Sequence, residues 1–218
     1  SPYPFPDGYD SGMRMRLDQV EGYVDTVLAL KKEYDKDIEI HLGLETEYFP
    51  RFWDQLIDFL SDYPFEYFVL GQHSLGNEIE KILYSGHGTT DGNYLKQYVD
   101  QCLAGIDTGK YLYLAHPDLF LFNGDEAVFD REYRRLCREV KKRNIPLEIN
   151  FLGLMEERWY PNEKFWKIAG EEGNTAVFGC DAHTSKAVWN PETEQKALQL
   201  AAKYGLKVQE TVPMPKTF

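Results

Sequence analysis

The sequence predicts an α/β fold in which parallel strands close into a TIM-like barrel. Segments with helical spacing of apolar residues alternate along the 218 residues with short apolar strands. Hydrophobic residues make up 43% of the chain, which is enough for a packed core. Residues of metal-ligand type also lie in or just after each of five predicted strands. Their even spread favours a barrel, because a doubly wound sheet gathers functional residues near one switch point.

Helices and strands alternate from the start of the chain. Apolar residues recur at helical spacing from Leu17 to Leu28, and residues 38–44 alternate as a strand does. Four glycines among polar residues predict a long loop over 74–93. The remaining elements of this half are a helix over 52–60, a strand over 67–70, a helix over 94–106 and a strand over 111–115.

The second half continues the alternation. Asn162 is a suitable N-cap for a helix that extends to Ala169. The other predicted elements are a helix over 125–143, strands over 146–150 and 175–179, a helix over 191–204 and a short terminal strand over 206–208. We find no internal repeat, low-complexity tract or linker, so we expect residues 1–218 to form a single domain.

Charge and apolar patterning exclude several classes of partner. With 24 basic and 36 acidic residues the net charge is −12, which argues against a nucleic-acid partner. A basic run on the helix over 125–143 is interpreted as the solvated side of an amphipathic helix. The chain contains no run of about 18 apolar residues, the length that is needed to cross a membrane. The basic run comprises Arg131, Arg134, Arg135, Arg138, Lys141, Lys142 and Arg143.

The three cysteines are widely spaced and form no CxxC pair, so neither a disulfide framework nor a thiolate zinc site is indicated. A reducing cytoplasm fits this composition best. The chain also lacks the GxxxxGKS/T, GxGxxG, HExxH and GxSxG patterns, which removes the common nucleotide-binding, zincin and serine-hydrolase templates.

Candidate metal ligands lie at the strand ends. Carboxylates and imidazoles together suit zinc, manganese or iron better than calcium or magnesium. A single histidine at a strand end is more often a hydrogen-bonded polar residue than a metal ligand. Here three of the five histidines follow predicted strands, and this joint pattern favours metal binding. We interpret His41 as a packed strand residue and His87 as a residue of the loop. The strand-end set is Glu45, His73, His116, Glu148, Asn150, Asp181 and His183.

These segments resemble the successive motifs of the polymerase and histidinol phosphatase (PHP) family, and most of all its histidinol-phosphate phosphatase branch. The motifs are residues 43–45, 71–73, 115–118, 147–150 and 179–183, and residues 3–9 and 12–15 resemble the same branch. The resemblance extends from residue 1 to about residue 188. It implies a distorted (β/α)7 barrel that binds up to three divalent metal ions and hydrolyses phosphate monoesters.

The resemblance also implies roles for individual residues. Arg158 resembles a position that contacts the substrate phosphate, and Glu148 and Asn150 match a site-lining motif that we assign to substrate binding. Asp181 and His183 match metal ligands and are the candidates to orient or deprotonate the attacking water. The positions that match metal ligands are Glu45, His73, His116, Asp181 and His183.

The sequence departs from the family pattern at its start. The family's first-strand His-x-His motif, a histidine soon after it, and one more just before the segment that matches Ser1 are absent. We therefore expect an N-terminally incomplete barrel with five of nine ligands. The expected substrate is histidinol phosphate, whose cationic amine suits an acidic protein. The alternatives are a phosphoesterase with another small phosphorylated substrate, or an inactive domain with a scaffold role. The oligomeric state stays open.

Overall fold

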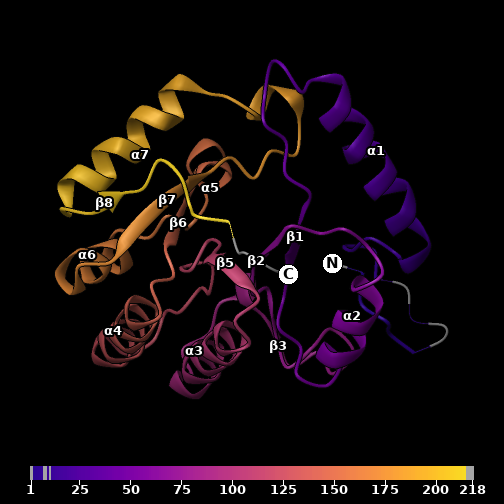
Figure 1. Cartoon of the computed structure of the whole chain (residues 1–218). Helices are drawn as coiled ribbons and strands as arrows, with labels where there is room; N and C mark the ends of the chain where they lie inside the picture. Colours follow the sequence, from indigo (N-terminus) through magenta and orange to yellow (C-terminus); the bar gives the residue numbers. More distant parts are fainter. Residues whose placement is uncertain (1, 7–8, 10, 215–218) are drawn as a thin grey trace.

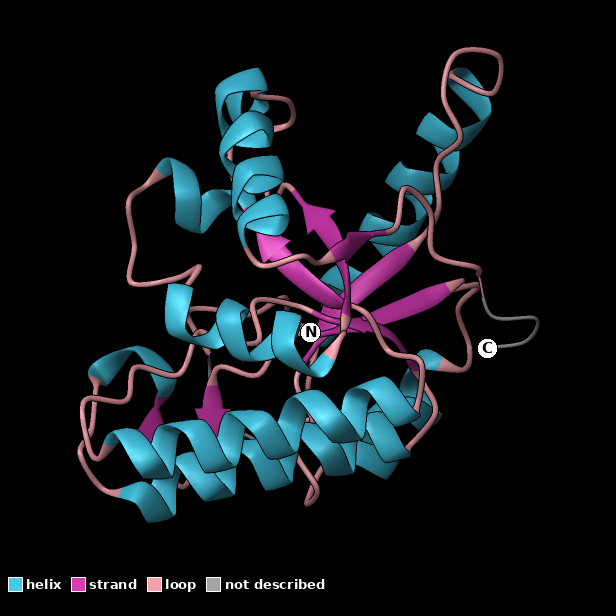
Figure 2. Cartoon of the chain, turned by 90° about the vertical axis from the view of Figure 1, so that its left-hand side faces the viewer, coloured by secondary structure: helices cyan, strands magenta, loops and turns pink. Residues whose placement is uncertain are grey.

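A six-stranded parallel sheet organises the computed structural model, which describes residues 2–6, 9 and 11–214. The strands lie side by side in chain order, so each crossover leads to the adjacent strand. In the side view the strand arrows fan out with the twist expected of a parallel sheet (Figure 2). The strands are β1 (Gly43–Thr46), β2 (Tyr67–Leu70), β5 (Tyr111–Leu114), β6 (Leu147–Asn150), β7 (Thr175–Gly179) and β8 (Lys207–Val208).

Helices form an arc around the strands (Figure 1). One hydrophobic cluster joins the helices to the sheet and extends along the chain from Tyr3 to Leu206, with Trp166 among its largest fully buried side chains. No helix in the described part of the chain is long and apolar enough to cross a membrane. The helices are α1 (Val20–Glu33), α2 (Trp53–Leu60), α3 (Gly92–Asp107), α4 (Glu126–Lys142), α5 (Phe151–Met155), α6 (Glu163–Glu172) and α7 (Pro191–Lys203).

The prediction of an α/β fold with a parallel sheet is confirmed. The structure places strands at 67–70 and 175–179 with the predicted bounds, and the short terminal strand pairs in parallel with β7. Asp125 caps α4 by accepting hydrogen bonds from two backbone N–H groups, and Asn162 caps α6. Within residues 2–6, 9 and 11–214 no pairing joins β1 to β8, so here the sheet is open, with β1 and β8 at its edges.

The predicted first strand was wrong at its start. The backbone N–H groups of Asp37 and Ile38 donate to the carbonyl of Tyr34, so these residues belong to the turn that ends α1. The strand begins only at Gly43. As a result, Glu45 lies inside the strand rather than after it, and His41 precedes the strand.

The segment over 74–93 contains more structure than the predicted loop. Strands β3 (Ser74–Leu75) and β4 (Leu83–Tyr84) form a short antiparallel pair, and residues 85–87 form a 3-10 turn. Helix α5, which follows β6 directly, was not predicted. Five apolar or small residues without a polar side give no helical period, so the sequence carries no signal for this helix.

The basic run on α4 lies on the exposed side of the helix, as predicted, and its members bind acidic groups. Arg134 contacts Asp130, Glu171 and Glu172. Arg143 contacts Asp107 and Glu139. The other five basic side chains each bond to a neighbouring carboxylate or carbonyl oxygen. The run is therefore an ion-pair network on the protein surface.

Candidate metal centre

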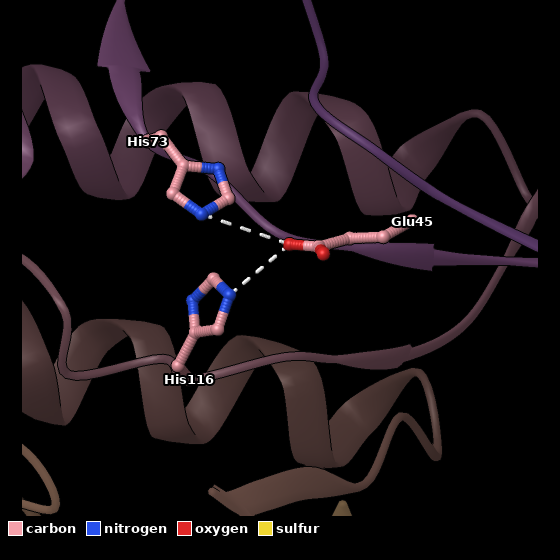
Figure 3. Close-up of side chains that lie close together, drawn as sticks. All are labelled: Glu45, His73 and His116. Atoms are coloured by element: carbon pink, nitrogen blue, oxygen red, sulfur yellow. Dashed lines mark hydrogen bonds and ion pairs between the residues drawn. The ribbon is translucent and has the colours of Figure 1, made fainter. Parts of the chain in front are cut away.

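Three neighbouring strands bring a carboxylate and two imidazoles together. Glu45 lies in β1, His73 follows β2, and His116 follows β5. Glu45 Oε1 lies 3.1 Å from His116 Nε2 and 3.7 Å from His73 Nε2 (Figure 3). One ligand atom from each residue lies within 4.8 Å of the other two. This convergence follows from the parallel topology, which places the carboxyl ends of adjacent strands side by side.

Details of the local structure fit a divalent ion at this triad. His116 is buried, and among the described residues its Nδ1 has no hydrogen-bond partner. Its backbone has a φ of 29°, a conformation that residues other than glycine rarely adopt. Such residues are found most often at functional sites. A Cβ on Gly71 would lie 1.8 Å from Glu45 Oε1, so this backbone leaves room for the carboxylate only as glycine. Two imidazoles and one carboxylate suit zinc, manganese or iron.

The ionisation of His116 and that of Glu45 depend on each other. Burial by itself would lower the pKa of His116, but the hydrogen bond and charge of Glu45 outweigh it and raise the pKa to about 9. Burial likewise opposes ionisation of Glu45, yet its hydrogen bond with His116 lowers its pKa to about 2. Both pKa shifts favour the charged forms of the pair, an imidazolium and a carboxylate.

A second group lies at the ends of β6 and β7. The side-chain amide of Asn150 donates to Glu148 (3.1 Å) and to Asp181 (3.2 Å), and the backbone N–H of His116 donates to Glu148 (2.9 Å). Burial raises the pKa of Glu148. Asp181 has a φ of 46°, and its Oδ1 lies 3.3 Å from Nε2 of the exposed His183.

One cavity of about 460 Å³ collects most of these side chains. The triad and the pair Asp181 and His183 line its wall together. Glu148 and Asn150 are buried behind this wall and do not line it. They touch His116 and Asp181, so the structure gives them contacts with candidate ligands. The lining residues are Met13, Arg14, Glu45, Thr46, Glu47, Gly71, His73, Tyr84, His116, Leu119, Leu152, Arg158, Tyr160, Asp181 and His183.

Arg158 lies at the same cavity. Its Nη1 donates to the Tyr160 hydroxyl (2.8 Å), and its other guanidinium nitrogens bind Glu156. Tyr160 in turn lies 6.1 Å from the ring of His116. A guanidinium held at the rim of a cavity can bind an anion with two parallel hydrogen bonds.

Two residues of this site were missed. Glu47 was not among the predicted ligands, but it is 1% exposed and its Oε1 lies 3.1 Å from His73 Nδ1. Burial raises its pKa, but the charge of Arg14 and the hydrogen bond with His73 outweigh this, so the net pKa is lowered. Its position two residues after Glu45, just past the end of β1, was the available signal, because residues i and i+2 of an extended segment share a side. Arg14 lies in the segment over 12–15 that resembles the family, but no role was predicted for it.

Fold and site together define an α/β protein with a candidate metal centre at the carboxyl ends of its parallel strands. No family model matches the chain. A curated protein of Deinococcus radiodurans named "Probable histidinol-phosphatase" is 23% identical over 195 residues, which cover 83% of this chain and 71% of that protein.

Two solved structures share the fold. The histidinol phosphate phosphatase of Lactococcus lactis subsp. lactis, solved with zinc, L-histidinol and phosphate, matches with a TM-score of 0.68 at 20% identity, covering 99% of this chain and 84% of its own. A candidate histidinol phosphatase from Listeria monocytogenes matches with a TM-score of 0.63 at 23% identity, covering 83% and 77%. At these identities the likeness supports the α/β fold itself.

Proposed function

We propose that the chain is a metal-dependent phosphomonoester hydrolase of the PHP family and that its substrate is histidinol phosphate. The observation that carries this proposal is the Glu45, His73 and His116 triad at the carboxyl ends of three adjacent strands. The relatives support the choice of reaction, because one of the two solved structures contains zinc, L-histidinol and phosphate. A cavity of about 460 Å³ is of the size that small ligands occupy.

The proposed ligands are Glu45, His73, His116, Asp181 and His183, which share the cavity wall. A bound divalent zinc, manganese or iron ion would neutralise phosphate charge and lower the pKa of water toward 7. Up to three ions would fill the complete family site.

The chain's own side chains would do the remaining work. Asp181, which accepts a hydrogen bond from Asn150, would orient the attacking water and accept its proton, or the exposed His183 would serve the same purpose. Arg158 would donate to phosphate oxygens from the rim of the cavity. Glu148 and Asn150 would act on substrate indirectly, by holding His116 and Asp181.

We also propose that residues 1–218 form one domain whose sheet is part of a distorted (β/α)7 barrel. Strand order that follows chain order, with helices in an arc outside the strands, supports this arrangement (Figure 1). The net charge of −12 favours a substrate that carries a cationic amine besides its phosphate. The free cysteines of the described chain, two of them buried, support a location in a reducing cytoplasm.

The test is a steady-state comparison of histidinol phosphate with 4-nitrophenyl phosphate in the presence of added zinc or manganese. We expect kcat/KM for histidinol phosphate to exceed that for the aryl ester by at least about tenfold, the equivalent of about 1.4 kcal/mol of transition-state binding. Equal values would favour a phosphoesterase with another small substrate. Absence of both activity and bound metal would favour a scaffold protein.

A further inference from the structure

Glu47 is surrounded by hydrogen-bond donors from four residues. Its Oε1 accepts from Arg14 and lies 3.1 Å from His73 Nδ1. Its Oε2 accepts from the backbone N–H of Ser74 (3.0 Å) and from the side-chain amide of Gln72 (3.3 Å). The side chain is 1% exposed, so its orientation is fixed by these contacts rather than by water.

This arrangement determines how the His73 ring is oriented. A carboxylate only accepts hydrogen bonds, so this contact requires a ring proton on Nδ1 that points at Glu47. The lone pair of Nε2 then faces the cavity, where Glu45 Oε1 lies 3.7 Å away. Carboxylates that accept the second N–H of a ligating imidazole typically fix the ring and strengthen metal binding.

Arg14 holds Glu47 from the other side. Its guanidinium contacts both Glu47 and Glu78, and its central carbon lies 5.1 Å from the ring centre of Phe49. Arg14 is largely buried, at 8% side-chain exposure, and so this ion pair is shielded from solvent. Removing one partner of such a pair is destabilising, because it leaves the other charge buried without compensation.

We propose that Glu47, held in place by Arg14, is a positioning residue that presents His73 Nε2 to the metal ion. This inference rests on the proposed metal site and extends it to a residue that does not itself bind the metal. Glu47→Gln keeps the size of the side chain but replaces one acceptor oxygen with a donor, so the two donors that this oxygen served lose their partner.

The chain offers a matched control. Glu66 makes the same kind of contact, 2.8 Å from His41 Nδ1, before the start of β2 and therefore at the opposite end of the strands. Zinc affinity of the full chain can be measured by competition with a chromogenic chelator for wild type, Glu47→Gln and Glu66→Gln. We expect Glu47→Gln to raise the zinc Kd by about 10- to 100-fold, as outer partners of ligating histidines do. Glu66→Gln should stay within about twofold of wild type.

The outcomes separate the two proposals. Folded Glu47→Gln protein with the zinc Kd of wild type would overturn the positioning role and leave the metal site standing. If wild type itself binds no zinc, the proposed metal site fails and the inference fails with it.

A measurement on the wild type alone covers the case in which Glu47→Gln does not fold. In zinc-loaded protein with 15N-labelled histidine, the imidazole nitrogen shifts report which ring nitrogen carries the proton. We expect His73 to carry it on Nδ1. A proton on Nε2 of His73 would overturn the inference.

Discussion

Two glutamate–histidine contacts lie at opposite ends of the neighbouring strands β1 and β2. Glu66 with His41 precedes the strands, and Glu47 with His73 follows them, at Nδ1 to carboxylate distances of 2.8 and 3.1 Å. The pair chemistry is the same, but Glu66 is 29% exposed and Glu47 is 1% exposed.

The two ends differ in what else reaches them. The free side of the His41 ring meets Glu39, which is 83% exposed, whereas the free side of the His73 ring faces Glu45 and, across it, His116. Among the described residues, only this second set brings three ligand atoms within 4.8 Å of one another. The comparison teaches that a carboxylate–imidazole pair becomes a candidate site only where several parallel strands end together.

The largest expected effect on catalysis comes from comparing the removal of one histidine at each end of the parallel strands. His116→Ala should lower the hydrolysis of histidinol phosphate by more than about 100-fold, beyond what loss of an outer partner typically costs, because it removes a proposed ligand. His41→Ala should leave kcat/KM within about threefold of wild type. Steady-state kinetics with added zinc measures both. Full activity in His116→Ala would sink the assignment of the triad.

The next largest effect is expected from substituting one glycine at each end of the strands. A Cβ on Gly71 would collide with the Glu45 carboxylate, while a Cβ on Gly43 would meet the Tyr67 ring at 2.4 Å. Gly71→Ala should raise the zinc Kd by at least about tenfold, because the displaced group is a proposed ligand. Gly43→Ala should cost about 1–3 kcal/mol of unfolding free energy through overpacking and leave the zinc Kd of the folded protein unchanged.

Chelator competition and urea unfolding distinguish the two glycine variants. Equal zinc affinity in both would show that the room left by Gly71 is unrelated to metal binding.

The sequence could predict those parts of the site that depend on residues near one another in the chain. His73 and His116 follow apolar strands, and parallel strands end at one edge, so the pattern of residues was enough to predict their proximity. The ion pair of Glu47 with Arg14 could not be predicted, because Arg14 lies 33 residues earlier in a segment without helical or strand periodicity. Nothing in the spacing of residues shows where such a segment packs.

The fold shows the same limit. The bounds of β2 and β7 were predictable because short apolar runs are delimited by polar and glycine residues. The start of β1 was not, because the alternation from Ile38 onward competes with backbone hydrogen bonds to Tyr34 that end α1. The strands β3 and β4 are two residues each, too short for a period to be recognised.

A smaller effect is expected for the arginine at the cavity. Arg158→Ala should lower kcat/KM for histidinol phosphate by about 10- to 100-fold, the equivalent of the roughly 1.5–3 kcal/mol that a hydrogen bond to a charged group contributes. Most of the change should be in KM. Arg131→Ala on α4, an arginine that pairs with Glu132 and does not line the cavity, should leave both constants unchanged. An unaltered KM in Arg158→Ala would remove Arg158 from the substrate site.

The smallest effect concerns stability at the end of the strands opposite the site. Burial opposes ionisation of Glu66, but hydrogen bonds from Lys31, His41 and the backbone of Leu42 lower its pKa to about 2. Since the folded-state pKa lies below the unfolded value, the contribution of Glu66 to stability is complete above about pH 4.5 and is lost as the pH falls toward 2.

Urea unfolding of wild type and Glu66→Gln at pH 7 and pH 3 measures this. We expect a difference of about 1 kcal/mol at pH 7, reduced by solvent screening, that narrows at pH 3. A difference that widens toward pH 3 would contradict the direction of the pKa shift.

The proposed metal site can be tested by locating the ion itself. Crystals grown with zinc, measured above and below the zinc absorption edge, would give an anomalous difference map of the full chain. We predict a peak within about 2.0–2.2 Å of Glu45 and of one imidazole nitrogen each of His73 and His116. A map with zinc bound elsewhere, at the Glu39, His41 and Glu66 end for example, and none at this triad would contradict the account.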